Sequence, residues 1–306
     1  MSDRLPYLNF IFHVGLYSFF GYDDIKSARR RSLKNGSEWF YERLRGRAYR
    51  PVSGSSETQQ YHAVKYGAGY DYFRAPFLIT RQNICNWLDL CVKCKATYVL
   101  ITSKHHDGFC LWNTNTTSRK SSNDVVQIFK EEALNRGLYF GIYYSWYEFE
   151  NSMTIDYFNR ICLPQLRELI TYSPSTIWFD GDWVIKTKAI ISEIANICYY
   201  LRSNGISIND RITAENRGYA SYHVGPDRFI PDTYMQNWQH ITTIGLSWGY
   251  NSQQEPPDYK SGRDLYNLLN RVVSLGGTML LNIGPRHDGT LDENELRSLL
   301  ELSELL

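Results

Sequence analysis

The chain has 306 residues, 43% of them apolar, and its 33 basic and 32 acidic residues leave a net charge of +1. This charge balance argues against a nucleic-acid partner, and no apolar run reaches the roughly 20 residues that a membrane span needs. The length suits one (β/α)8 barrel, for which about 250 residues are typical, and no linker-like stretch divides residues 1–306 into two domains.

Short apolar segments alternate with longer segments of helical periodicity. In chain order, strands are expected at residues 8–12, 98–102, 139–144, 176–179, 206–208, 233–236 and 279–283. Helices are expected at residues 81–95, 123–136, 155–172, 186–203, 262–275 and 291–305. Such alternation is typical of parallel strands joined by crossover helices. Because no Gly-x-Gly-x-x-Gly motif follows the first strand, we predict an α/β fold of the (β/α)8-like TIM-barrel type in a single domain.

Polar and titratable side chains gather where these strands end. His13 follows the first strand, His105 and His106 follow the second, Asp180 follows the fourth, and Arg211 follows the fifth. The carboxyl ends of barrel strands form a single active-site face. These side chains are therefore expected to meet in one pocket.

Each of these residues has two interpretations when taken alone. Asp180 lies in Trp-Phe-Asp-Gly-Asp-Trp at residues 178–183, a setting that suits a nucleophile facing a sugar ring, but Asp180 or Asp182 would equally suit a helix cap. The paired histidines suit a polyol better than a metal, because neighbouring side chains of an extended segment point in different directions. Lone histidines are commonly core residues, and arginines commonly form surface ion pairs.

The cysteines and the first residues bear on the compartment. The sequence begins Met-Ser-Asp-Arg-Leu-Pro, without the features of a secretory signal, so we expect an intracellular protein with six free thiols. Cys91 and Cys94 have the spacing of half a zinc site, but no second pair follows at a suitable distance. Neither a metal nor another cofactor is expected.

Eight motifs in order, spread over about 270 residues, resemble the α-L-fucosidases of glycoside hydrolase family 29. They are Phe-Ile-Phe-His-Val-Gly-Leu-Tyr-Ser at 10–18, Glu-Trp-Phe at 38–40, Thr-Ser-Lys-His-His-Asp-Gly-Phe-Cys-Leu-Trp at 102–112, Gly-Ile-Tyr-Tyr-Ser at 141–145, Trp-Phe-Asp at 178–180, Asn-Asp-Arg at 209–211, Ser-Trp-Gly-Tyr-Asn at 247–251 and Leu-Leu-Asn-Ile-Gly-Pro at 280–285.

This resemblance implies a retaining hydrolase that removes terminal α-L-fucose from glycoconjugates through a fucosyl-enzyme intermediate. It implies Asp180 as the nucleophile. It also implies a set of fucose-binding residues, namely His13, Glu38, Trp39, His105, His106, Tyr143, Trp178, Arg211 and Trp248. The expected partner is a fucosylated glycan, with no nucleic acid and no membrane, and the oligomeric state stays open.

The sequence departs from the family in three places. Ser221 stands where much of the family has its acid/base glutamate, and a serine cannot replace a carboxylic acid as proton donor. Glu215 is the first substitute and Glu38 the alternative. Val14 stands where a Trp is usual, and the chain ends where the family usually continues into a β-sandwich, so we expect no C-terminal β-sandwich. The alternative functions are a catalytically impaired fucose-binding relative and, since fold does not fix function, a barrel enzyme for another glycoside.

Overall fold

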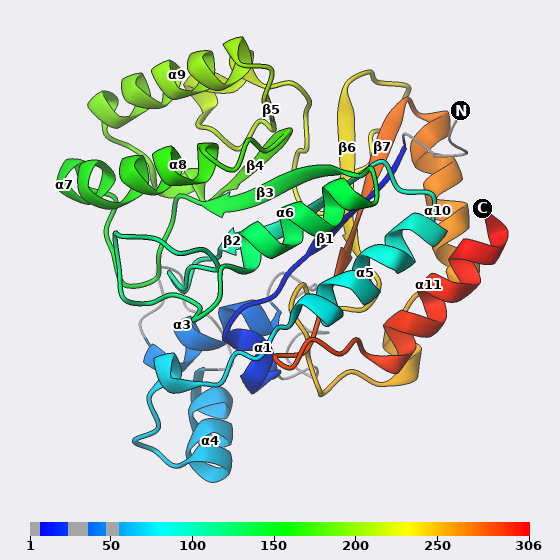
Figure 1. The fold of residues 1–306 in the computed structure, drawn as a ribbon, viewed down its shortest axis with the longest axis horizontal. Helices are drawn as coiled ribbons and strands as arrows, with labels where there is room; N and C mark the ends of the chain where they lie inside the picture. The colour runs from blue at the N-terminus through cyan, green and yellow to red at the C-terminus, as the bar shows by residue number, and fades with distance from the viewer. Residues whose placement is uncertain (1–6, 24–35, 47–54) are drawn as a thin grey trace.

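The computed structural model describes residues 7–23, 36–46 and 55–306. Its strands form one curled, all-parallel sheet in the order β5-β4-β3-β2-β1-β7-β6 (Figure 1). The strands are β1 (Leu8–Phe12), β2 (Tyr98–Lys104), β3 (Tyr139–Ser145), β4 (Thr176–Asp180), β5 (Ser207–Ile208), β6 (Trp238–Thr243) and β7 (Gly277–Ile283). The predicted parallel α/β sheet is confirmed.

A two-residue segment connects the two outermost strands of this sheet. Tyr222 forms a parallel bridge with Asn209 after β5, and His223 forms a parallel bridge with Trp238 of β6. The His223 N–H donates to the Asn237 carbonyl at 2.7 Å, and the His223 carbonyl accepts from Gln239 at 2.8 Å. Tyr222 and His223 therefore take the place of an eighth strand, and the (β/α)8-like prediction is confirmed.

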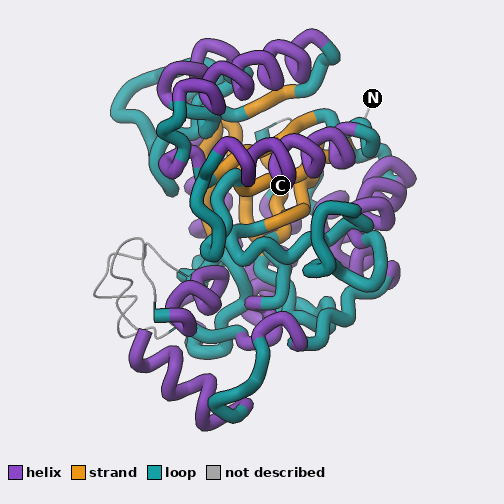
Figure 2. The backbone as a smooth tube through the Cα atoms, turned by 90° about the vertical axis from the view of Figure 1, so that its left-hand side faces the viewer, coloured by secondary structure: helices purple, strands orange, loops and turns teal. Residues whose placement is uncertain are grey.

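The helices form a layer outside the sheet (Figures 1 and 2). Helix α5 buries Ile84, Trp87, Leu88 and Cys91, which recur at the three- and four-residue spacing of one helical face. All six predicted helices are confirmed, as α5 (Arg81–Lys93), α6 (Val125–Asn135), the continuous run of α7 (Ile155–Tyr157), π-helical η3 (Phe158–Cys162) and α8 (Leu163–Ile170), α9 (Lys188–Ser203), α10 (Gly262–Ser274) and α11 (Glu293–Leu305).

A further group of short helices, which the sequence did not predict, covers the carboxyl end of β1. They are α1 (Tyr17–Phe20), η1 (Ser37–Trp39), α3 (Phe40–Arg45) and α4 (Ser55–Tyr66). Helix α4 is largely polar and buries only Thr58 and His62, so it carries little periodic signal. Stacked rings hold the group together. The ring centroid of Phe20 lies 4.5 Å from that of Phe40 and 5.0 Å from that of Tyr72.

The predicted strand at residues 233–236 is wrong, because that segment is irregular and the strand is β6. The sequence of β6, Trp-Gln-His-Ile-Thr-Thr, reads as a loop because four of its six residues are polar. All six are nevertheless buried. Gln239 accepts a hydrogen bond from the Trp178 indole at 3.1 Å, and the His240 imidazole bonds the Phe229 carbonyl at 2.8 Å. Partnered polar side chains inside a barrel thus obscure the strand pattern.

The inside of the barrel holds a small core of its own. It consists of Ile11, Leu100, Tyr143, Trp178, Val224, Ile241, Trp248 and Leu280. The larger core lies between the sheet and the helices and includes the inward faces of α5, α6 and α9. Two rings of the inner core, those of Tyr143 and Trp178, stack with their centroids 5.7 Å apart.

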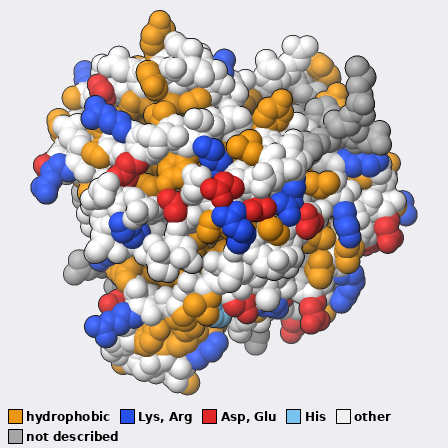
Figure 3. Space-filling view, in the orientation of Figure 1, with side chains coloured by type: hydrophobic (Ala, Val, Ile, Leu, Met, Phe, Trp, Pro, Cys, Tyr) orange, Lys and Arg blue, Asp and Glu red, His pale blue; other side chains and the backbone are white. Residues whose placement is uncertain are grey.

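The outer surface carries interspersed charge of both signs. On the face shown in Figure 3, acidic and basic side chains lie side by side over α5 and α6. There Arg81 binds Glu131 and Glu132, and Arg136 binds Glu132 and Asp89. Among the helices of the described ranges, none combines the length and apolar character that a bilayer crossing requires. The six cysteines are free thiols, five of them buried.

Candidate active site

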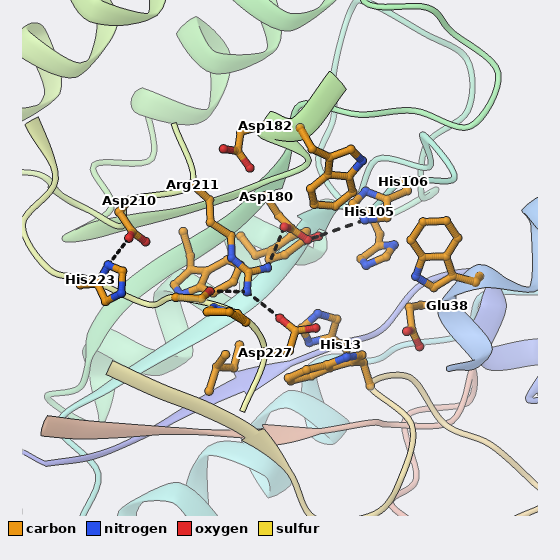
Figure 4. Close-up of a pocket in the computed structure, with 18 of the residues that line it drawn as sticks. His13, Glu38, His105, His106, Asp180, Asp182, Asp210, Arg211, His223 and Asp227 are labelled. Carbon is orange, nitrogen blue, oxygen red and sulfur yellow. Dashed lines mark hydrogen bonds and ion pairs between the residues drawn. The ribbon is translucent and has the colours of Figure 1, made fainter. Parts of the chain in front are cut away.

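A pocket of about 600 Å³ opens among the residues that follow the barrel strands (Figure 4). Ten of the residues singled out in the sequence line it, namely His13, Glu38, Trp39, His105, His106, Tyr143, Trp178, Asp180, Arg211 and Trp248. The prediction that the strand-end residues meet in one pocket is therefore confirmed.

Strand geometry explains how these side chains come together. Along β4, Trp178 and Asp180 are two residues apart, so both point to the inside of the barrel, while Ile177 and Phe179 point to the outer core. His13 continues the ladder just beyond β1, since its N–H donates to the Ile283 carbonyl at 2.9 Å. The hydrogen bonds between neighbouring strands thus fix the position of each side chain along the barrel.

Asp180 lies at the centre of the pocket in an extensive hydrogen-bond network. Its Oδ1 accepts from Arg211 Nη1 at 2.9 Å, its Oδ2 accepts from the Tyr143 hydroxyl at 2.7 Å, and His106 Nε2 lies 3.7 Å from Oδ2. Burial raises the pKa of Asp180, but the Arg211 charge and the Tyr143 hydrogen bond outweigh burial, so the pKa lies below its usual value. Asp180 is therefore an ionised, oriented carboxylate, and it caps no helix.

A glycine allows the chain to turn sharply after Asp180. Gly181 has φ +82°, and a Cβ on it would lie 2.7 Å from Tyr147 Cβ and 2.8 Å from the Tyr147 backbone nitrogen. Any larger residue would strain the backbone or displace the Tyr147 segment. The short helix η4 (Asp182–Val184) starts directly after this turn.

Hydrogen bonds fix the tautomers of two pocket histidines. The Ser145 hydroxyl donates to the Tyr147 carbonyl at 2.7 Å, so the Nδ1–H of His106 is the donor in its 2.6 Å contact with Ser145 Oγ. His13 Nδ1–H likewise donates to Asn282 Oδ1 at 2.5 Å. The Nε2 lone pair of each neutral ring is then left to accept a hydroxyl hydrogen.

The three pocket histidines that follow β1 and β2, namely His13, His105 and His106, are neutral near pH 7. Burial lowers the pKa of His13 and that of His106 to about 4, and it lowers the pKa of His105 well below its usual value. Hydrogen bonds to neutral polar groups can bind a polyol without adding charge next to Asp180.

Glu38 lines the pocket but is held by the backbone. Its Oε1 accepts from Gly36 N at 3.0 Å, and its Oε2 accepts from Gly249 N at 3.2 Å. Burial raises the pKa of Glu38 to about 6. The neighbouring Trp39 packs its ring against His106 at 5.4 Å, which gives the pocket an aromatic wall.

Neither Glu215 nor Ser221 lines this pocket. Glu215 lies in η5 (Ala214–Tyr219) and lines a second, adjoining pocket. The Ser221 hydroxyl accepts hydrogen bonds from the Ile208 N–H at 2.9 Å and from Arg202 at 2.6 Å, away from the site. The structure therefore does not place the first substitute for the acid/base in the pocket that holds Asp180.

Sequence reasoning missed a second carboxylate beside Asp180. Asp227 Oδ1 lies 2.5 Å from Arg211 Nη2, so one guanidinium binds both carboxylates (Figure 4). Burial lowers the pKa of Arg211, but the charges of Asp227 and Asp180 raise it above its usual value. Asp227 follows Gly-Pro in a loop and has no local motif, so only its contact with Arg211 identifies it. Other pocket residues that were missed are Arg217 and His223.

Arg211 is positioned from two further directions. Its guanidinium carbon lies 4.7 Å above the Trp178 ring, and its Nη2 also donates to the Gly225 carbonyl at 3.3 Å. Stacking on an aromatic face and donation to several oxygens hold the planar group in one orientation. In the described part of the chain, no group of three or more His, Cys, Asp or Glu residues is arranged to bind a metal ion.

Comparisons with known proteins point to one family. A sequence model for the family described as Alpha-L-fucosidase matches residues 9–306. The α-L-fucosidase of Dictyostelium discoideum is 30% identical over 322 residues, which cover 96% of this chain and 67% of that protein. The plasma α-L-fucosidase of Rattus norvegicus is 30% identical over 296 residues, which cover 86% of this chain and 62% of that protein.

Solved structures give the same result. The crystal structure of Thermotoga maritima alpha-fucosidase matches with a TM-score of 0.82 at 29% identity, covering 97% of this chain and 71% of that one. The structure of the same enzyme in complex with fucose matches with a TM-score of 0.81. The chain spans 62–67% of the length of the Rattus and Dictyostelium relatives.

Proposed function

We propose, from the premise that this chain belongs to the α-L-fucosidase family, that it is a retaining glycosidase that removes terminal α-L-fucose from fucosylated glycans. One observation carries the proposal. Asp180 is held ionised by Arg211 and Tyr143 in a pocket lined by neutral histidines and tryptophans. An ionised carboxylate facing a pocket built for hydroxyl groups is what nucleophilic attack on a sugar requires.

In the first step, an oxygen of Asp180 forms a bond to the anomeric carbon as the bond to the leaving-group oxygen breaks. The transition state resembles an oxocarbenium ion, and an acid protonates the departing oxygen. Arg211 and Tyr143 orient the attacking carboxylate, while neutral His13 and His106 accept hydroxyl hydrogens of the sugar. In the second step, water attacks the ester and transfers a proton to the same acid/base group.

We propose Asp227 as that acid/base group. A retaining enzyme holds its two carboxyl groups about 5–5.5 Å apart, and Asp180 and Asp227 bind neighbouring nitrogens of one guanidinium. The Asp227 side chain is 41% exposed, so water and a leaving group can reach it.

The shared guanidinium also balances charge in both steps. During attack, Arg211 pairs with ionised Asp180 while Asp227 transfers a proton to the departing oxygen. Once Asp180 is esterified and Asp227 has given up its proton, Arg211 pairs with Asp227. One positive charge therefore faces one negative charge throughout, which avoids an uncompensated charge in a buried site.

The two carboxylates proposed from sequence suit the role less well. Both oxygens of Glu38 are occupied by backbone N–H groups, and its side chain is buried. Glu215 lines the adjoining pocket and not the one that holds Asp180. If Asp227 does not transfer the proton, the alternative is a fucose-binding relative with little turnover, which the outward-facing Ser221 favours.

The test is release of a phenol from an aryl α-L-fucoside between pH 4 and 8, with Asp180→Asn as the background. Proton NMR of the first product should show α-L-fucose, because double displacement retains the configuration. L-Fucose should raise the melting temperature, since a ligand at 100 times its Kd stabilises the folded state by about 2.7 kcal/mol. A thermal shift without turnover would support the fucose-binding alternative. The absence of both would overturn the proposal.

A further inference from the structure

The loop at residues 225–229 carries Asp227 and leads into β6. Arg211 holds the first part of this loop, because its Nη2 donates to the Gly225 carbonyl at 3.3 Å and binds the Asp227 carboxylate. An ion pair of this kind fixes the carboxylate but not the backbone behind it. The direction of the Asp227 side chain therefore depends on a second contact of the loop.

Arg228, the next residue, makes that contact. Its Nη2 donates to Thr243 Oγ1 at 3.1 Å and to the Leu246 carbonyl at 3.4 Å, and its guanidinium carbon lies 4.9 Å from the centroid of the Trp248 ring. Thr243 ends β6, and Trp248 is a wall of the pocket. Arg228 thus ties the loop that carries Asp227 to the segment that carries this wall.

We propose that Arg228 is a positioning residue that sets where the proposed acid/base, Asp227, stands beside the bound sugar. In Figure 4, Asp227 lies on the same side of Asp180 as His13, where a sugar held by the histidines would lie. Arg228 is not among the residues that line the pocket, so it acts through Asp227. The inference rests on the proposed function and adds to it a residue outside the pocket on which proton transfer depends.

The backbone of Arg228 supports this role. Its φ of +60° lies in the left-handed region, which residues with a Cβ rarely adopt and glycine adopts freely. In this conformation its N–H donates to the Ile241 carbonyl at 3.2 Å. An arginine in a position that suits glycine indicates that contacts of the side chain offset the strain.

An arginine stacked on a tryptophan is commonly only a packing contact. Here, burial lowers the pKa of Arg228, and the charges of Asp227 and Glu38 raise it by less, so the pKa lies below its usual value. The guanidinium is therefore partly removed from water and within electrostatic range of two pocket carboxylates. A contact that only packed at the surface would not place a charge there.

The pocket wall has supports that do not depend on Arg228. The Trp248 carbonyl accepts from Asn282 Nδ2 at 2.6 Å, and the Trp248 ring packs against that of His13 with the centroids 5.6 Å apart. Loss of the guanidinium should therefore leave the fucose site in place and release the loop that carries Asp227. Binding and proton transfer should respond differently to the same substitution.

The test compares kcat/KM of the wild type and Arg228→Ala on three α-L-fucosides, with 2-chloro-4-nitrophenol, 4-nitrophenol and phenol as leaving groups. Phenol, the least acidic of the three, needs protonation most. A misplacement of about 1 Å can cost about 100-fold, so we expect a loss of about 100-fold for the phenyl fucoside and at most about threefold for the 2-chloro-4-nitrophenyl fucoside. The Kd for L-fucose, measured by calorimetry, should stay within about threefold of the wild-type value.

Lys260→Ala is the matched control. Lys260 Nζ donates to the Thr243 carbonyl at 2.7 Å, so this lysine anchors the same end of β6 without belonging to the loop of Asp227. It should lower the melting temperature and reduce kcat/KM by the same factor for all three substrates. If Arg228→Ala does not fold, Thr243→Val removes one acceptor of the guanidinium and should show the same graded loss on a smaller scale.

The outcomes separate this inference from the proposed function. A uniform loss with Arg228→Ala, or a graded loss with Lys260→Ala, would overturn the role of Arg228 alone, provided that Asp227→Asn shows the graded loss. A uniform loss with Asp227→Asn would overturn the assignment of the acid/base and this inference with it. Absence of turnover in the wild type would overturn the proposed function itself.

Discussion

The floor and the rim of the pocket are built differently. The floor consists of His13, His105, His106, Tyr143 and Asp180, which lie on or just after β1 to β4. The rim consists of the pocket residues between positions 209 and 227, where loops, the short helix η5 and the two-residue bridge of Tyr222 and His223 lead from β5 to β6. A hydrogen-bonded ladder positions the floor, whereas ion pairs and strained residues position the rim. The proposed nucleophile therefore belongs to the part held by the strand ladder, and the proposed acid/base to the part held by ion pairs.

The floor carries the largest expected effect. Asp180→Asn should reduce kcat for an aryl α-L-fucoside by about 10⁴-fold or more, because no covalent intermediate can form. The matched control is Asp182→Asn, two residues away on the same turn, for which we expect a loss of about tenfold at most. Comparable losses in the two variants would show that the floor has no special role.

The next largest effect is expected at the rim. Asp227→Asn should reduce kcat by about 10²–10⁴-fold, the usual contribution of a positioned general acid/base. The loss should shrink for substrates with good leaving groups. Asp232→Asn, an exposed carboxylate of the same loop, is the control.

Azide distinguishes the roles of the two carboxylates. With Asp227→Asn it should attack the fucosyl-enzyme and give an α-L-fucosyl azide. With Asp180→Ala it should attack the substrate directly and give a β-L-fucosyl azide. If Asp227→Asn also yields the β-azide, or if its activity matches that of Asp232→Asn, Asp227 is not the acid/base.

A smaller effect is expected from a residue that only orients the nucleophile. Tyr143→Phe keeps the ring stacked on Trp178 but removes the 2.7 Å hydrogen bond to Asp180. Because a hydrogen bond to a charged group contributes about 1.5–3 kcal/mol, kcat/KM should fall roughly 10- to 100-fold. The same change raises the pKa of Asp180, so the acidic limb of the pH–rate profile should move to higher pH. An unmoved limb would contradict this role.

The smallest effect concerns the protonation of His13 and His106 in the floor. Burial lowers the pKa of His13 and of His106 to about 4, against 6.5 in the unfolded chain. Between pH 4 and pH 6.5 the unfolded state binds more protons than the folded state. Both histidines therefore contribute to the stability of the fold above pH 6.5, and their contribution is lost as the pH falls to 4. NMR titration of the two imidazoles should show no transition between pH 5 and 7. Midpoints near 6.5 would mean that the floor is hydrated.

The sequence predicts the floor well and the rim poorly, for physical reasons. Alternation along a strand determines which residues face inward, so once β4 is placed, Trp178 and Asp180 share the inner face. Asp227 is positioned by a contact with Arg211 across 16 residues, and no local pattern encodes that contact.

The same contrast explains why Glu215 lies outside the pocket that holds Asp180 and why the strand predicted at residues 233–236 was wrong. Glu215 is only four residues from Arg211, yet Thr213 turns the chain between them with a positive φ that a threonine rarely adopts. In β6, four buried polar residues replace the apolar runs that mark most of the other strands, and the partners of Gln239 and His240 come from distant elements. Tertiary contacts determine both features.

The most direct measurement is identification of the covalent intermediate. The protein is incubated with a 2-deoxy-2-fluoro-L-fucosyl fluoride, which slows hydrolysis of the ester, then digested and sequenced by mass spectrometry. We predict one fluorofucosyl group on Asp180 and none in the Asp180→Asn variant. A label on Asp227, Glu38 or any other carboxylate would contradict the assignment of Asp180 as the nucleophile.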